Sequence, residues 1–257
     1  MRFLIVAAAV LLTAGCANMS GGATQSTADA DAAQSAIYAA IADAGRPQAD
    51  RDRDADRKPA EMLALAGVRP GMNIIEMLPG GGYFTRIFSK AVGPTGHVYA
   101  EIGNLPPNPQ RPPAVNAIAA DPAYANVTVR TDAFTALTPP APVDLVWTSQ
   151  NYHDLHLARL NLDVAAVNRS VFNSLRPGGL YVVLDHAATP GSPVGVADTL
   201  HRIDPAIGRQ EVEAAGFVFV SESNAVRNPA DPHTANVFDA AIRGHTDQFI
   251  LVFRRPG

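Results

Sequence analysis

The chain has 257 residues, of which 47% are hydrophobic, and its formal net charge is −4. This length suits one folded domain with a leader, or at most two small domains. Because Lys and Arg are spread along the chain rather than massed, the composition speaks against a nucleic-acid partner, which would need a clustered basic face.

The N-terminus has the pattern of an export leader. Arg2 gives a positive start, residues 3–12 form an apolar run, and small residues precede Cys16. The run is too short to span a bilayer and is typical of a signal peptide, here residues 1–16. An ordinary secretory signal or a buried strand is the alternative. Cys16 is the only cysteine, so no disulfide can form within the chain.

Residues 12–16, Leu-Thr-Ala-Gly-Cys, resemble a bacterial lipobox. In such leaders the cysteine is lipidated and becomes the new N-terminus. The resemblance implies an exported protein with a lipid anchor at Cys16, held at the periplasmic face of a bacterial membrane, with the outer membrane as the expected location. Acyl chains contribute about 0.8 kcal/mol per buried methylene, so such an anchor holds firmly.

The next segment, residues 17–50, is expected to be a flexible tether with one short helix over 36–44. Residues 17–33 are rich in Ala, Ser, Gly, Thr and Asp and offer too little apolar surface to fold. The folded domain is then expected over 51–257. It opens with the mixed-charge run 51–58, which is either the solvated start of a helix or a lid over a site. Pro59 suits the first turn of the following helix, and Gly67 its end.

From there, strands and helices alternate along the chain. Strands are expected at 73–77, 97–101, 127–130, 143–148, 180–185, 217–222 and 248–254. Helices are expected at 80–92, 114–120, 163–175 and 209–215. This alternation predicts a parallel sheet with helices on both faces. The last two strands are joined without a clear helix, which predicts an antiparallel hairpin.

The most informative segment joins the first of these strands to its helix. A buried strand containing Glu76 runs into Gly80, Gly81 and Gly82. Glycine lets main chain approach a ligand closely, and in open α/β sheets ligands bind beyond the carboxyl ends of the strands. The loop lacks the Gly-Lys-Ser/Thr of a P-loop, and Thr85 breaks the dinucleotide spacing G-x-G-x-x-G. A tight connection without a ligand is the alternative.

The loop resembles motif I of class I S-adenosylmethionine-dependent methyltransferases, an acid followed by G-x-G-x-G. Glu76 matches the acid, and Gly80 and Gly82 match the second and third glycines, whereas Leu78 stands where the first glycine usually lies. Residues 144–147 resemble motif IV, and residues 175–179, Leu-Arg-Pro-Gly-Gly, resemble the turn before the fifth strand. The likeness covers about residues 58–255 and is nearest to exported bacterial methyltransferases.

The resemblance implies a Rossmann-like, doubly wound, mostly parallel seven-stranded sheet with an antiparallel C-terminal hairpin. It also implies S-adenosyl-L-methionine as cofactor. Glu101 would bind the ribose, and Asp132 would lie near the adenine amine. The residues expected to contact the cofactor are Glu76, Pro79, Gly80, Gly81, Gly82, Tyr83, Glu101, Asp132 and Asn151.

Six of the seven histidines follow residue 150, and several end strands or loops at the same expected edge of the sheet. We predict an acceptor pocket in which His153 or His186 serves as general base, oriented by Asp185. For each histidine taken singly, the alternative to a catalytic role is a purely structural one. His153, His156 and Asp185 could instead bind a metal, although no zinc signature supports this. The polar loop 227–233 either covers this pocket as a lid or caps the final hairpin.

The sequence therefore predicts a methyltransferase acting on an unidentified acceptor, expected to be a small molecule. Two alternatives remain open: a repurposed binding protein on the same fold, and a metal-assisted hydrolase using the histidine-rich edge. A physical argument favours the repurposed binding protein: S-adenosylmethionine is made in the cytoplasm, and an exported enzyme would need a supply of it.

Overall fold

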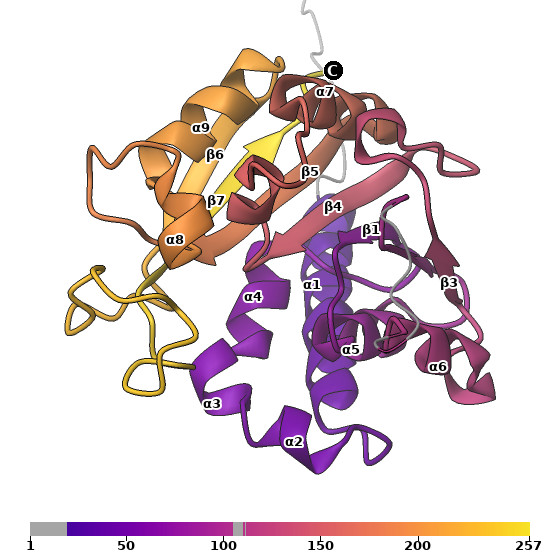
Figure 1. Cartoon of the computed structure of the whole chain (residues 1–257). Coiled ribbons are helices and arrows are strands. Elements are labelled where there is room, and N and C mark those ends of the chain that lie inside the picture. Colours follow the sequence, from indigo (N-terminus) through magenta and orange to yellow (C-terminus); the bar gives the residue numbers. More distant parts are fainter. Residues whose placement is uncertain (1–19, 105–109, 111) are drawn as a thin grey trace, which may run out of the picture.

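The computed structural model describes residues 20–104, 110 and 112–257, with backbone only for residues 20–26. Its centre is a seven-stranded sheet in the order β3-β2-β1-β4-β5-β7-β6 (Figure 1). The strands are β1 (Asn73–Met77), β2 (His97–Glu101), β3 (Val127–Arg130), β4 (Val143–Ser149), β5 (Leu175–His186), β6 (Val218–Ser223) and β7 (Gln248–Arg254). The sheet confirms the predicted fold class.

The direction of the strands follows from their connections. β1 to β5 are parallel, because helices or 3₁₀ turns cross between them. β7 lies antiparallel between β5 and β6, so the predicted C-terminal hairpin is confirmed. The strand order reverses between β1 and β4, and β1 pairs with β4 from Ile74 to Met77. This switch point is where an open α/β sheet binds its ligands.

Helices cover both faces of the sheet (Figure 1). The helices are α1 (Ser20–Ile41), α2 (Gln48–Arg51), α3 (Asp54–Arg57), α4 (Pro59–Leu65), α5 (Tyr83–Val92), α6 (Val115–Ala120), α7 (Val164–Ser174), α8 (Val196–Leu200) and α9 (Pro205–Ala214). Short 3₁₀ turns are η1 (Pro122–Tyr124), η2 (Phe134–Ala136) and η3 (His153–His156). α1, α4, α5 and α6 contribute to the core on one face, and α7 and α9 to the core on the other.

Amphipathic patterning decides which surfaces are buried. In α5, Phe84, Ile87, Phe88 and Ala91 recur at helical spacing and are all buried. Phe84 and Phe88 pack edge-on against Trp147 of β4, with ring centroids 4.9 and 5.6 Å apart. α5 is thereby seated against the sheet, and its first turn stands at the end of β1.

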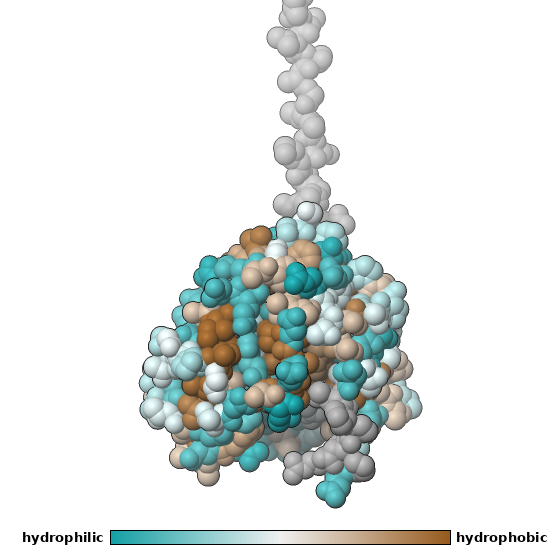
Figure 2. All heavy atoms as spheres, turned by 45° about the horizontal axis from the view of Figure 1, so that its top comes forward, coloured by the Kyte–Doolittle hydropathy of each residue, from teal (hydrophilic) through white to brown (hydrophobic). Residues whose placement is uncertain are grey.

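The edge strand β6 alternates between half-buried and exposed residues, and it leaves Val218 and Val220 55% and 43% exposed. Figure 2 shows that hydrophobic patches on the face turned forward are small and are separated by hydrophilic residues. Among the helices of the described residues, none is long and apolar enough to cross a bilayer.

The predicted tether needs correction where the structure describes it. Instead of a flexible segment with a helix over 36–44, α1 runs continuously from Ser20 to Ile41. Alanine has the highest helix propensity, so an alanine-rich segment forms a helix without large apolar side chains. Ile37 and Ala40 then bury this helix against the domain. The leader and Cys16 lie outside the described residues.

The other elements agree with the sequence to within a few residues, with four exceptions. β5 starts at Leu175, earlier than expected, and the short helices α2, α3 and α8 were not predicted. Helices α2 and α3 lie within or beside the mixed-charge run 51–58. They place that run over the end of β1, which bears directly on the site.

Candidate functional site

The glycine loop turns sharply between β1 and α5. Leu78, Gly80 and Gly82 all have positive φ, at 51°, 56° and 76°. Leu78 therefore keeps the conformation for which the motif normally uses glycine, at the cost of strain that a glycine would avoid. A Cβ added at Gly80 or Gly81 would meet no atom within 4 Å, whereas one at Gly82 would lie 2.1 Å from the Ile118 side chain. The loop is open at Gly80 and Gly81 and tightly packed at Gly82.

A cavity of about 530 Å³ lies against the open part of this loop. Its volume is within the range of small-molecule sites. It is lined by Asp50, Arg53, Arg57, Leu78, Pro79, Gly80, Gly81, Tyr83, Ser149, Gln150, Asn151, His153, Asp154, Arg159, His186, His201, Val237 and Phe238. The glycine loop, the loop after β4 and the histidines thus meet in one space, as the sequence predicts.

Other predicted site residues do not line this cavity: Glu76, Gly82, Glu101, Asp132 and Asp185. Glu76 is buried beneath the loop and accepts a hydrogen bond of 2.5 Å from Thr85 Oγ1 in α5. Burial raises the pKa of Glu76 to about 8, so this carboxyl is mostly protonated at neutral pH. It ties β1 to the first turn of α5.

The two acids expected at the ribose and adenine also have partners within the chain. Glu101 is buried, and its Oε1 accepts a hydrogen bond of 3.0 Å from the backbone N–H of Gly103. Burial raises the pKa of Glu101 to about 7. Asp132 pairs with Arg130 at 2.9 Å and accepts the backbone N–H of Thr138 at 2.7 Å. The neighbouring loop residues 105–109 and 111 lie outside the described residues.

Asn151 joins the two loops at the switch point. Its side-chain Nδ2 donates to the backbone carbonyl of Leu78 at 2.9 Å and to that of Met77 at 3.3 Å. The loop after β4 therefore holds the base of the glycine loop in position. Asn151 lines the cavity while its amide nitrogen serves this structural contact.

Asp185 at the end of β5 organises the histidines. Its fully buried carboxylate accepts hydrogen bonds from the backbone N–H groups of His153 and His186, at 2.6 and 2.7 Å. It also contacts Nδ1 of His153 at 2.8 Å. The predicted pairing of Asp185 with His153 is thus present. When Nδ1 of His153 donates its proton to a hydrogen bond with Asp185, Nε2 of the same ring takes no part in the contact with Asp185.

The surroundings move the pKa values of this group in opposite directions. Burial alone would lower the pKa of His153, but the charge and hydrogen bond of Asp185 outweigh it and raise that pKa. Burial would raise the pKa of Asp185, and His153 instead holds it below its usual value. Burial lowers the pKa of His186 to about 4, so this imidazole is neutral at pH 7. Its Nδ1 lies 2.7 Å from Thr246 Oγ1.

The metal set suggested by spacing alone, His153, His156 and Asp185, is wrong. Nε2 of His156 contacts Glu211 at 3.1 Å, and His156 does not line the cavity. His153 and His156 both lie in η3, but their rings have different partners, because Asp185 holds Nδ1 of His153 and Glu211 contacts Nε2 of His156. Asp154 and His201 lie beside His153 instead.

Arginines that the sequence did not assign to the site line the cavity. The Arg57 guanidinium lies 4.5 Å from the centroid of the Tyr83 ring and donates to Ser149 Oγ at 3.1 Å and Gln150 Oε1 at 3.2 Å. Burial lowers the pKa of Arg57 to about 10, so the group is still a cation at neutral pH. Arg53, four residues earlier, stands 5.8 Å from the same ring.

Ion pairs fasten this arginine-bearing segment to the domain. The buried Arg46 forms a bidentate salt bridge with Asp54, with hydrogen bonds of 2.6 and 2.8 Å. Asp54 also accepts a hydrogen bond of 2.5 Å from the Tyr83 hydroxyl. Of the two interpretations of run 51–58, the structure favours a cover over the site. Arg53 and Arg57 are spaced to share a helical face, and this i, i+4 spacing was the signal available in the sequence.

The loop 227–233 caps the final hairpin. Asp247, next to β7, accepts two hydrogen bonds from the Arg227 side chain at 2.8 and 2.9 Å and one from the Asn228 backbone at 2.7 Å. Asp231 is held by Arg202 inside the protein. The residues that reach the cavity come from later in the connection, Val237 and Phe238.

Comparison with known proteins agrees with this geometry at the level of the fold. No protein-family profile and no curated protein matches the chain. Solved structures do match it. A methyltransferase dependent on S-adenosylmethionine (SAM) from Aquifex aeolicus aligns with a TM-score of 0.52 and 16% identity, over 76% of this chain and 87% of that one.

Two further structures are similar to the chain. A SAM-dependent methyltransferase from Mesorhizobium loti aligns with a TM-score of 0.52 and 19% identity, over 79% of this chain and 100% of that one. The N-methyltransferase NodS from Bradyrhizobium japonicum aligns with a TM-score of 0.54 and 12% identity, over 81% and 99%. The protein therefore has the fold of the class I SAM-dependent methyltransferases.

Proposed function

We propose that this protein is a SAM-dependent methyltransferase that acts on a small-molecule acceptor. The observation that carries the proposal is the cavity at the switch point, where the open glycines, the loop after β4 and His153, whose ring is held by Asp185, face one space. A tight connection without a ligand would not need this space. The cavity has a volume of about 530 Å³ and lies beside glycines, which have no side chains to fill it. This suits a ligand that lies along the backbone.

The residues of the cavity fit the polar parts of the cofactor. Pro79, Gly80 and Gly81 would contact it through main chain, and the Arg57 cation suits its carboxylate. Glu101 does not line the cavity, and its carboxyl, when ionised, would suit the ribose hydroxyls. When bound, the cofactor supplies an electrophilic methyl group on a sulfonium.

The histidine-rich end of the cavity would hold the acceptor. Asp185 fixes the ring of His153 through Nδ1 and anchors its backbone, so that Nε2 can take a proton from an acceptor hydroxyl or amine. His186 is neutral and can accept or donate one hydrogen bond. Holding donor and acceptor in line would supply much of the rate.

Calorimetry with SAM and S-adenosylhomocysteine (SAH) tests the proposal on the purified chain. We expect micromolar binding of SAH that tightens about tenfold between pH 6 and pH 8, because the ionised fraction of a carboxyl with pKa about 7 rises by that factor. The sign follows from the ionised carboxylate, which would accept hydrogen bonds from the ribose hydroxyls, whereas the protonated form accepts less well. Glu101→Gln should bind more weakly and lose this pH dependence. Absence of binding at both pH values would overturn the proposed function.

We also propose that the chain is exported and anchored by lipid at Cys16. The support is the leader sequence alone, with its apolar run 3–12 and the lipobox-like residues 12–16. Cells grown with labelled palmitate should incorporate label into the protein, and Cys16→Ser should remain unlabelled. Mass spectrometry of the mature N-terminus provides the second measurement: a cleavage site elsewhere, with no acyl group, contradicts the anchor.

A further inference from the structure

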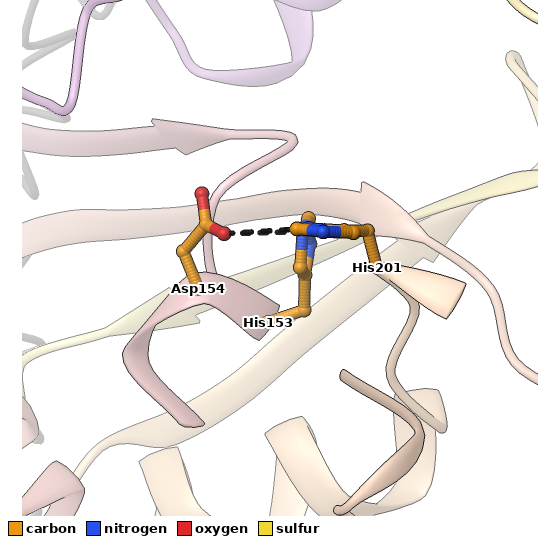
Figure 3. A group of neighbouring side chains, drawn as sticks. All are labelled: His153, Asp154 and His201. Carbon is orange, nitrogen blue, oxygen red and sulfur yellow. Dashed lines mark ion pairs between the residues drawn. The ribbon is translucent and has the colours of Figure 1, made fainter. Parts of the chain in front are cut away.

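Three potential ligand atoms converge at the histidine-rich end of the cavity. His153 and Asp154 come from η3, and His201 follows α8 (Figure 3). Asp154 Oδ1 lies 3.4 Å from His153 Nε2 and 3.7 Å from His201 Nδ1. All three ligand atoms lie within 4.8 Å of one another. Figure 3 shows the three side chains turned toward a common point.

These distances suit a shared ion better than direct hydrogen bonds. An N–H···O hydrogen bond has a heavy-atom distance near 2.9 Å, and contacts of 3.4 and 3.7 Å are too long for a good one. Ligands bound about 2.0–2.1 Å from a tetrahedral ion are about 3.3 Å apart. The two distances from Asp154 are therefore close to the ligand spacing of a metal centre, and the two imidazoles lie within 4.8 Å of each other.

His201 supplies a second observation. Its Nδ1 is buried and has no hydrogen-bond partner among the described residues. A buried polar atom without a partner is unfavourable, so such atoms are rare in folded proteins. His201 also has positive φ, at 53°, in a conformation that L-residues seldom adopt. Its neighbour Arg202 is fully buried and forms a bidentate salt bridge with Asp231, which holds this strained backbone in place.

The surrounding groups complete the arrangement. Asp185 contacts Nδ1 of His153, and a carboxylate on the second ring nitrogen is the usual outer partner of a metal-bound histidine. Arg159 lines the same cavity, and the carboxylate of Asp154 offsets part of its positive charge. The neutral His186 adds no repulsion.

We propose that His153, Asp154 and His201 bind a divalent transition-metal ion, for which zinc has the best match of ligand types and spacing. Two imidazoles and one carboxylate are a ligand set of zinc sites that keep an open coordination position. That position would face the cavity and take an oxygen, nitrogen or sulfur atom of the acceptor. The metal site rests on the cluster itself and not on methyl transfer. An ion on Nε2 of His153 would prevent this residue from accepting the proton; the ion would instead lower the pKa of a bound acceptor hydroxyl, whose proton would pass to water.

Calorimetric titration of the EDTA-treated chain with ZnCl₂ tests the site. We expect one equivalent of zinc to bind, and cobalt(II) to give the visible absorption of a tetrahedral complex. His201→Asn should weaken zinc binding by more than the ~10–100-fold that loss of an outer partner costs. Asparagine tolerates positive φ, so this variant keeps the backbone conformation. Asp154→Asn is a second ligand variant of unchanged size.

His156→Ala is the matched control, because His156 is the neighbouring histidine that contacts Glu211 rather than the cluster. It should bind zinc as the unaltered chain does. Thermal melting of each variant verifies that it is folded. Binding of less than one equivalent of zinc by the unaltered chain overturns the metal site. So does zinc binding by His201→Asn and Asp154→Asn that is as tight as in the unaltered chain. SAH binding by the zinc-free chain is measured in parallel, so failure of the metal site and failure of the proposed function give different results.

Discussion

Replacing Arg202 by methionine is expected to lower the free energy of unfolding by about 3–5 kcal/mol. Arg202 and Asp231 have fully buried side chains joined by hydrogen bonds of 2.8 and 3.1 Å. The guanidinium also donates to the backbone carbonyls of Ala187 and Ala235, at 3.0 and 3.1 Å. Methionine fills similar volume but leaves the Asp231 carboxylate buried without its counter-ion.

Urea denaturation measures this effect, and the single Trp147 in the core is a suitable fluorescent reporter. The control is the double variant Arg202→Met with Asp231→Asn, which removes the unpaired charge while keeping an acceptor for the backbone N–H of Asp247. We expect it to recover part of the loss. A single variant as stable as the unaltered chain would show that the pair is not a structural anchor for the His201 turn.

Replacing Gly81 by valine is expected to weaken SAH binding by about 100-fold, with little change in thermal stability. Gly81 lies in the cavity wall, its φ is not positive, and a Cβ built on it meets no atom within 4 Å. The fold therefore accepts the side chain, while the added carbons occupy the space where main chain would lie against the ligand. Calorimetry of SAH and a thermal melt measure the two quantities.

Gly195→Val is the matched control for Gly81→Val. Gly195 precedes α8 outside the cavity lining, with φ of −61° and no atom within 4 Å of an added Cβ. Both variants add the same side chain to an open glycine, so nonspecific effects should be equal. Unchanged SAH affinity in Gly81→Val would place the ligand away from the glycine loop and contradict the proposed cofactor site.

The strands were predictable because their signals are local. Residues 73–77 and 97–101 are short apolar runs bounded by turn residues, and β1 and β2 have those bounds. The N-terminal segment was less predictable. Low apolar content indicates a tether, whereas alanine propensity favours a helix, and burial of Ile37 and Ala40 in the domain is a tertiary effect.

Part of the candidate site was also predictable from the sequence. Glycines after the first strand and polar residues after the fourth and fifth strands must meet at one edge of a parallel sheet, and the structure places Gly80, Asn151 and His153 in one cavity. The same rule cannot say which of these polar groups turn inward to other partners. Glu76 bonds to Thr85 because α5 packs against β1, and Asp132 pairs with Arg130, which stands only two residues before it.

Local sequence determined the order of strands and helices, and with it the fold class, because hydrophobic period, glycine and proline act over a few neighbouring residues. Only the tertiary structure decided that Arg57 covers the cavity and that His201, rather than His156, joins His153 and Asp154. Arg57 and His201 are distant in sequence from the residues that they join, and their contacts depend on side-chain direction after packing. Distances of a few ångströms between separate elements cannot be read from spacing along the chain.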